Sequence, residues 1–160
     1  MTIAELKKHL DAAEKSPKQI AAAVSGLPEK TLRYKPTQKR WCILEILNHL
    51  ADVEIVYAHR LRQILADKEP VMAPFDPDDW SSHLGYMDAN PAELVAFYGL
   101  NRHHNLRLLR RLEPADLERS GYHLERKRKV TVAEIIEMMG SHGVHHLDQI
   151  EGLKKAAVKR

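Results

Sequence analysis

The chain has 160 residues, of which 44% are hydrophobic, 29% are charged and one is cysteine. A chain of this length can bury enough surface to fold without disulfides. A single cysteine excludes disulfide scaffolds and the zinc or iron–sulfur sites that need several thiolates. The formal charge of +3 is too small to predict nucleic-acid binding. We therefore expect one soluble globular domain, residues 1–160, in a reducing, cytoplasmic setting.

Neither export nor membrane insertion is predicted from the hydropathy pattern. The first eight residues, MTIAELKK, lack the basic-then-apolar order of a signal peptide. No stretch approaches the roughly 18 consecutive apolar residues of a membrane span. Histidine is the unusual feature of the composition, with ten copies of a residue suited to metal binding and proton transfer.

Two helices are predicted in the first half of the chain. The first opens at a capping box made by Thr2 and Glu5 and ends near Gly26, and Pro17 marks a point where it is expected to break. The second spans residues 42–66. Apolar residues recur there with helical spacing, at Ile46, Leu47, Leu50, Val53, Tyr57, Leu61 and Ile64.

A long connection, residues 67–90, follows the second helix. Three prolines and a glycine predict irregular structure with at most a short turn. Phe75 and Trp80 within it favour a loop that packs onto the domain, and Trp80 is the candidate for a lid over a site in the bundle.

Two more helices are predicted in the second half. Asn90, Pro91 and Glu93 open the third, which is expected to reach Leu112 before Pro114 stops it. Its inward residues are predicted to be Leu94, Phe97, Leu108 and Leu112. Thr131 and Glu134 form a second capping box and open the fourth helix, whose apolar stripe runs to Leu153. No strand-like alternation competes, so we predict an all-α fold, a four-helix bundle with a long loop between its second and third helices.

Histidines occupy positions of two helices where the helical period calls for apolar residues. His142 and His146 are four residues apart and share a face of the fourth helix, and His49 lies between the core positions Ile46 and Val53. Three imidazoles on two facing helices are typical of metal sites in bundle cores. Three protein ligands leave coordination positions open for water or substrate, as in catalytic sites.

Each of these histidines, and the single cysteine, also has a simpler structural interpretation. A lone inward histidine such as His49 is more often a core residue satisfied by a hydrogen bond. His145 also shares a face with His142, so either neighbour can complete the pair. Cys42, near a helix N-terminus, has the position of an activated nucleophile, but the role of a small buried hydrophobe is favoured.

Candidate proton-transfer and supporting groups are weaker. Asp52 lies three residues past His49, and Gln149 lies seven residues past His142 on the same face. Asp52 and the loop carboxylates Asp76 and Asp79 are more often surface or turn residues. Gln149 is a candidate for holding a metal ligand by a hydrogen bond. A polar patch on the third helix, Asn101, His104 and Asn105, either lines a pocket or faces solvent.

Three segments carry a family resemblance. They are WCILEILNHLADVE at residues 41–54, FDPDDW at residues 75–80 and SHGVHHLDQI at residues 141–150. Together they resemble the DinB-like, or YfiT-like, metal-binding four-helix bundles. The resemblance implies a divalent ion, zinc or nickel, held by His49, His142 and His146, in a bundle that often forms a homodimer. Members of that family include metal-dependent hydrolases and transferases of low-molecular-weight thiols.

The sequence therefore supports a metal-dependent enzyme that acts on a small-molecule substrate, by hydrolysis or by transfer of a low-molecular-weight thiol. A non-catalytic or stress-response bundle, in which the ion only stabilises the core, is the alternative. Nucleic-acid binding through residues 126–129 and 154–160 is disfavoured, because such basic runs are usually solvated surface.

Overall fold

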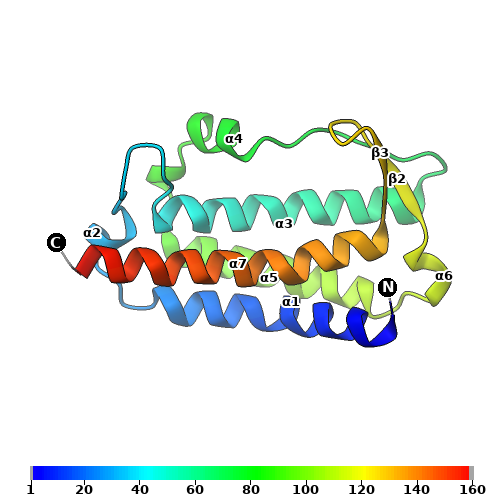
Figure 1. Cartoon of the computed structure of the whole chain (residues 1–160), viewed down its shortest axis with the longest axis horizontal. Coiled ribbons are helices and arrows are strands. Elements are labelled where there is room, and N and C mark those ends of the chain that lie inside the picture. Colours follow the sequence, from blue (N-terminus) through cyan, green and yellow to red (C-terminus); the bar gives the residue numbers. More distant parts are fainter. Residues whose placement is uncertain (1, 159–160) are drawn as a thin grey trace.

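Four long helices form an elongated bundle in the computed structural model, which describes residues 2–158 (Figure 1). They are α1 (Ile3–Val24), α3 (Ile43–Ala66), α5 (Pro91–Leu109) and α7 (Val132–Val158). Helix α1 packs along α7 and α5, and α3 packs against α5 and α7. Helices α1 and α7 run in one direction and α3 and α5 in the other (Figure 1). The predicted all-α four-helix bundle is confirmed, and no helix among residues 2–158 is long and apolar enough to cross a membrane.

The predicted helix starts are confirmed by their caps. At α1 the Glu5 backbone N–H donates to Thr2 Oγ1 at 3.2 Å, and the Thr2 N–H donates to the Glu5 carboxylate at 2.7 Å. Thr131 and Glu134 make the same exchange ahead of α7. Each box satisfies backbone donors that a helix N-terminus otherwise leaves without a partner.

Pro17 lies inside α1, yet the helix is continuous from Ile3 to Val24, so the expected break does not occur. Proline lacks an N–H, which leaves the carbonyl of Ala13, four residues earlier, without its intrahelical donor. Ser16 Oγ donates to that carbonyl at 3.1 Å, and Arg102 Nη1 of α5 donates to it at 3.2 Å. A tertiary contact therefore replaces the hydrogen bond that proline removes.

The inward face predicted for the third helix is only partly confirmed, because Leu94 and Leu112 are partly buried against the apolar core while other predicted positions are not. Helix α5 ends at Leu109, Phe97 is 44% exposed, and the buried residues are Tyr98, Arg102, Asn105, Leu106 and Leu109. Two of these five are strongly polar and fully buried. Apolar periodicity cannot reveal a helix face that is itself partly polar.

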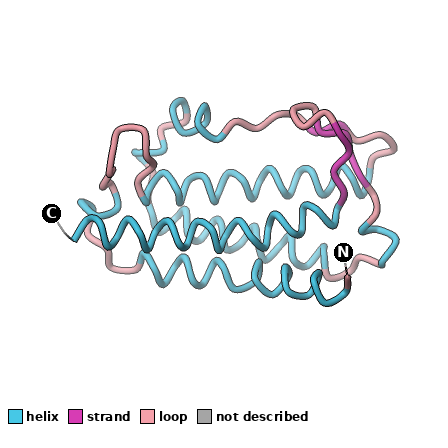
Figure 2. Tube along the Cα trace, in the orientation of Figure 1, coloured by secondary structure: helices cyan, strands magenta, loops and turns pink. Residues whose placement is uncertain are grey.

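Short helices and strands fill the connection after α3, where irregular structure with at most a short turn was expected, and also the connection after α5. Residues 67–90 contain β1 (Val71–Met72), α4 (Pro77–His83) and the 3₁₀ turn η1 (Tyr86–Asp88). Residues 113–131 contain α6 (Pro114–Leu117), β2 (Ser120–His123) and β3 (Arg128–Thr131), and α2 (Glu29–Leu32) precedes α3. Strand β2 pairs in parallel with β1 and antiparallel with β3, which makes the small sheet in Figure 2. Strands of two to four residues are too short to show alternation in sequence.

Two glycines let α7 lie directly on α1. A Cβ atom at Gly140 would stand 2.7 Å from the His9 carbonyl oxygen, and one at Gly143 would stand 2.5 Å from Ser16 Cβ. Any larger side chain would push the two helices apart. Because Gly143 faces α1, this contact sets the rotation of α7 and so decides which of its residues face α3.

The buried apolar residues form two clusters along the bundle axis, and a polar layer lies between them. On α3 the break falls between Leu50 of one cluster and Val53 of the other. On α7 it falls between Met139 and Ile150, the stretch that holds the histidines. The bundle core thus places polar side chains at mid-length, where the candidate site lies.

Candidate metal centre

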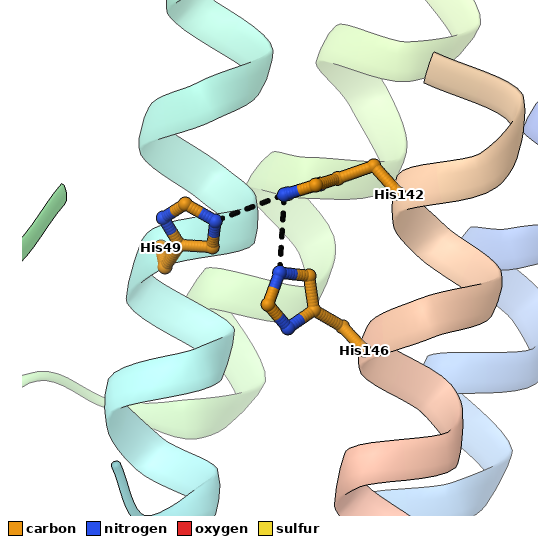
Figure 3. A group of neighbouring side chains, drawn as sticks. All are labelled: His49, His142 and His146. Carbon is orange, nitrogen blue, oxygen red and sulfur yellow. Dashed lines mark hydrogen bonds between the residues drawn. The ribbon is translucent and has the colours of Figure 1, made fainter. Parts of the chain in front are cut away.

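The three predicted ligands converge between α3 and α7. His49 of α3 points toward His142 and His146, which lie one turn apart on α7 (Figure 3). His142 Nε2 is 3.0 Å from His49 Nε2 and 3.0 Å from His146 Nε2. One nitrogen from each ring lies within 4.8 Å of the others. Such separations suit ligands of one ion at bonds of about 2.0–2.1 Å.

Burial keeps all three imidazoles neutral. His49 and His146 are each 5% exposed, and His142 is half-buried. Burial lowers the pKa of His49 to about 3, of His142 to about 2 and of His146 to about 4, and mutual repulsion of the rings adds to the effect at His49 and His142. A neutral imidazole carries the lone pair that a metal ligand needs.

The hydrogen bonds around the rings fit a bound cation better than three free imidazoles. Gln149 Oε1 lies 2.7 Å from His146 Nδ1, so that nitrogen carries the proton and His146 Nε2 carries a lone pair. His142 Nε2 then has to donate to His146 and cannot also accept from His49, although both contacts are 3.0 Å. A cation between three lone pairs removes this conflict, so the donor set fits a divalent ion.

His146 rather than His145 joins the cluster. His145 is exposed, and its ring lies beside that of His146 with centroids 5.1 Å apart. The alternative pairing of His142 with His145 is therefore not the arrangement that the fold adopts. Gln149 occupies the supporting position that its spacing predicted, although it contacts His146 and not His142. Such a partner fixes the tautomer of a ligating histidine.

Aromatic side chains surround the cluster. Trp41 packs against His49 with ring centroids 4.9 Å apart, and Phe75 stacks on the same ring at 6.2 Å. Trp80, the candidate lid, contacts Phe75 edge-on at 4.7 Å, so it is linked to the His49 ring through Phe75. Tyr57, predicted to be core, is buried, and its ring meets His142 edge-on at 6.2 Å. These rings limit the access of water to the site.

The candidate carboxylates have other partners. Tyr86 donates its hydroxyl to Asp52 Oδ2 at 2.5 Å, and burial raises the pKa of the Asp52 carboxyl. Asp76 caps α4 by accepting from two backbone N–H groups, and Asp79 is exposed. Cys42 is fully buried, and burial raises the pKa of its thiol, which agrees with a packing role.

A buried ion pair in the polar layer was missed by sequence reasoning. Arg102 Nε donates to Glu54 Oε2 at 2.8 Å, and both side chains are almost completely buried. Asn105, left undecided in the polar patch of the third helix, donates to Glu54 Oε1 at 2.8 Å, whereas His104 is exposed. Asn101 donates to the Phe97 carbonyl of its own helix at 3.2 Å. The signal that was available is the position of Glu54, four residues after core Leu50 and three before core Tyr57, on the same face of the helix.

The lowered histidine pKa values predict acid sensitivity of the metal-free protein. In the unfolded chain the imidazoles take up protons near pH 6.5, whereas the buried rings stay neutral down to about pH 4 or below. The free energy of unfolding should therefore fall as the pH drops below about 6.5, by about 1.4 kcal/mol per pH unit for each histidine. Urea unfolding at pH 7, 6 and 5 measures this. The variant H49Q/H142Q/H146Q should show a flatter profile, and an equal slope in both proteins contradicts the prediction.

Known proteins with similar sequences carry names that agree with this site. The chain is 26% identical over 150 residues to a protein of Oceanobacillus iheyensis named "Putative metal-dependent hydrolase", covering 94% of this chain and 86% of that one. It is 24% identical over 148 residues to the "Putative metal-dependent hydrolase YfiT" of Bacillus subtilis, covering 92% and 83%.

The fold itself matches a solved structure. That structure is described as "YfiT from Bacillus subtilis is a probable metal-dependent hydrolase with an unusual four-helix bundle topology". It superposes with a TM-score of 0.91 at 22% identity, over 98% of this chain and 89% of that one. The sequence model of the DinB superfamily matches residues 12–150. This chain belongs to the DinB superfamily.

Proposed function

We propose that this protein is a metal-dependent hydrolase that acts on a small molecule through a zinc or nickel ion held by His49, His142 and His146. The observation that carries the proposal is the convergence of three neutral imidazoles, two of them buried and one half-buried, with His142 Nε2 3.0 Å from the Nε2 atoms of both partners. Three ligands leave open positions, which is the pattern of catalytic sites rather than structural ones. The names of the relatives support the same reaction class.

A divalent ion held by the three histidines would supply a water of lowered pKa, near 7, and would polarise a substrate carbonyl. The protein's own residues prepare that chemistry. Gln149 holds the proton of His146 on Nδ1, which leaves the Nε2 lone pair available for a metal ion. Trp41 and Phe75 shield the His49 ring from bulk water, which strengthens electrostatic interactions within the site.

The test compares metal-free and metal-loaded protein purified without an affinity tag. After removal of metal with EDTA, zinc or nickel is added back, and hydrolysis of 4-nitrophenyl acetate and of a panel of small amides is measured. We expect hydrolysis that depends on the added metal and disappears in H142A. H145A is the matched control, because it removes an exposed histidine from the same helix and should keep the activity.

Two other outcomes would redirect the proposal. Metal-dependent consumption of cysteine with 1-chloro-2,4-dinitrobenzene, without ester or amide hydrolysis, would indicate transfer of a low-molecular-weight thiol. An ion that raises the melting temperature while no substrate is turned over would overturn the enzymatic proposal in favour of a structural ion. The homodimer and the cytoplasmic location stay predictions, to be measured by light scattering and by cell fractionation.

A further inference from the structure

An open pocket of about 640 Å³ lies beside the histidine cluster. It is formed by the segment that precedes α3, by the first turns of α3 and α4 and by the C-terminal turns of α7. Its apolar wall consists of Trp41, Ile46, Leu153 and Ala156. The volume is within the range of small-molecule sites, about 300–1,000 Å³.

Two cations without partners line this pocket. Lys39 and Arg40 form no ion pair and no side-chain hydrogen bond with any other residue of the range 2–158. Asp78 lines the pocket too, from α4, and is not within ion-pair distance of either cation. By contrast, the neighbouring Lys35 is paired with Glu45 at 2.7 Å. A pocket with an apolar wall and two free cations is complementary to a small organic anion.

The pocket shares two side chains with the surroundings of the histidines. Trp41 lines the pocket and packs on the His49 ring. Gln149 lines the pocket and accepts the hydrogen bond from His146 Nδ1. A molecule in the pocket would therefore lie against the groups that shield and orient two of the three proposed ligands.

We propose that this pocket binds a small amphipathic carboxylate, with its apolar part against Trp41 and Leu153 and its anionic group at Lys39 and Arg40. The assignment of this pocket as the place where the enzyme holds the anionic group of its substrate rests on the proposed function. Binding of a free carboxylate in the pocket does not rest on the proposed function, because the residues that recognise the anion are separate from the three histidines. The hydrolase would then prefer esters or amides that carry a carboxylate away from the reacting bond.

The probes are phenylacetate and its neutral isostere phenylacetamide, titrated into ¹⁵N-labelled full-length protein. The indole N–H signal of Trp41 reports binding, and the W80F variant distinguishes it from the signal of the other tryptophan, Trp80. Phenylacetate should move the Trp41 signal with a Kd at least about tenfold lower than phenylacetamide, as expected for charge-assisted hydrogen bonds. The variant K39Q/R40Q should raise the Kd of phenylacetate by about tenfold and leave that of phenylacetamide unchanged.

The control variant is K68Q/R111Q. It removes the same two charges from exposed positions two residues beyond the ends of α3 and α5, and it should leave both Kd values unchanged. Equal affinity for the two probes, or an equal loss in the control variant, overturns the proposal.

The titration is repeated on metal-free protein and on zinc-loaded protein to separate the two proposals. We expect phenylacetate to bind the metal-free form with the same dependence on Lys39 and Arg40. Binding that requires zinc would mean that the carboxylate ligates the ion, and this overturns the pocket assignment. Binding that depends on the two cations, in a protein that takes up no zinc, would support the anion site and refute the proposed hydrolase.

Discussion

Replacing His142 with alanine should remove bound metal almost completely. His142 is the central residue of the cluster, because its Nε2 atom lies 3.0 Å from the Nε2 atoms of both His49 and His146. Its loss would leave two imidazoles from different helices, which is fewer than the three or four protein ligands of known zinc sites. We expect a metal content below about a tenth of wild type, by elemental analysis of untagged protein dialysed against a metal-free buffer.

H49A and H146A should behave as H142A does, and H145A should keep the wild-type metal content. His145 lies next to His146 in the chain but is exposed, so it controls for unspecific binding of metal to histidine. Undiminished metal in any one of the three cluster variants would remove that residue from the site. Loss of metal in H145A together with retention in H146A would show that α7 is rotated relative to the structure.

Replacing Arg102 with methionine should destabilise the metal-free protein by about 3–5 kcal/mol. The change leaves the Glu54 carboxylate buried with Asn105 as its remaining side-chain partner, and it removes the α5 donor to the Ala13 carbonyl that Pro17 leaves unpaired. An uncompensated buried charge is costly because the bundle interior solvates it poorly. The free energy of unfolding of a native protein is about 5–15 kcal/mol, so this loss would be a large part of it. Urea unfolding measured by circular dichroism tests the prediction.

The surface pair between Arg110 and Glu14 provides the control. Arg110 Nη2 lies 2.6 Å from Glu14 Oε1, but both side chains are about half exposed. R110M should therefore cost no more than about 1 kcal/mol. The double variant E54L/R102M, which removes both buried charges, should recover part of the stability lost in R102M. A cost for R102M as small as that for R110M would contradict a strongly coupled buried pair.

Local sequence signals predicted the helices well. The caps at Thr2, Asn90 and Thr131 lie where the structure has them, because a cap depends on residues within one turn of each other. The stripe on the second helix was equally clear, since most of the buried residues of α3 are apolar. The spacing of His142 and His146 is also local, and it brought both onto one face of α7.

Contacts between distant segments explain what local signals missed. The strands of the small sheet are stabilised by pairing between Val71 and Tyr122, about fifty residues apart. The inward face of α5 is defined by Arg102 and Asn105, whose burial is possible only because Glu54 of α3 faces them. Pro17 does not break α1 because Arg102 reaches the freed carbonyl.

The amino-acid sequence by itself determined the four helices, their starts and the histidines that can face a common interior, because these follow from capping and from the helical period. The tertiary structure decided that His146 and not His145 meets His49, since both are compatible with the spacing from His142. The physical reason is steric: Gly140 and Gly143 lie so close to His9 and Ser16 that α7 has one rotation against α1. That rotation turns His142 and His146 toward α3 and brings the three imidazoles together.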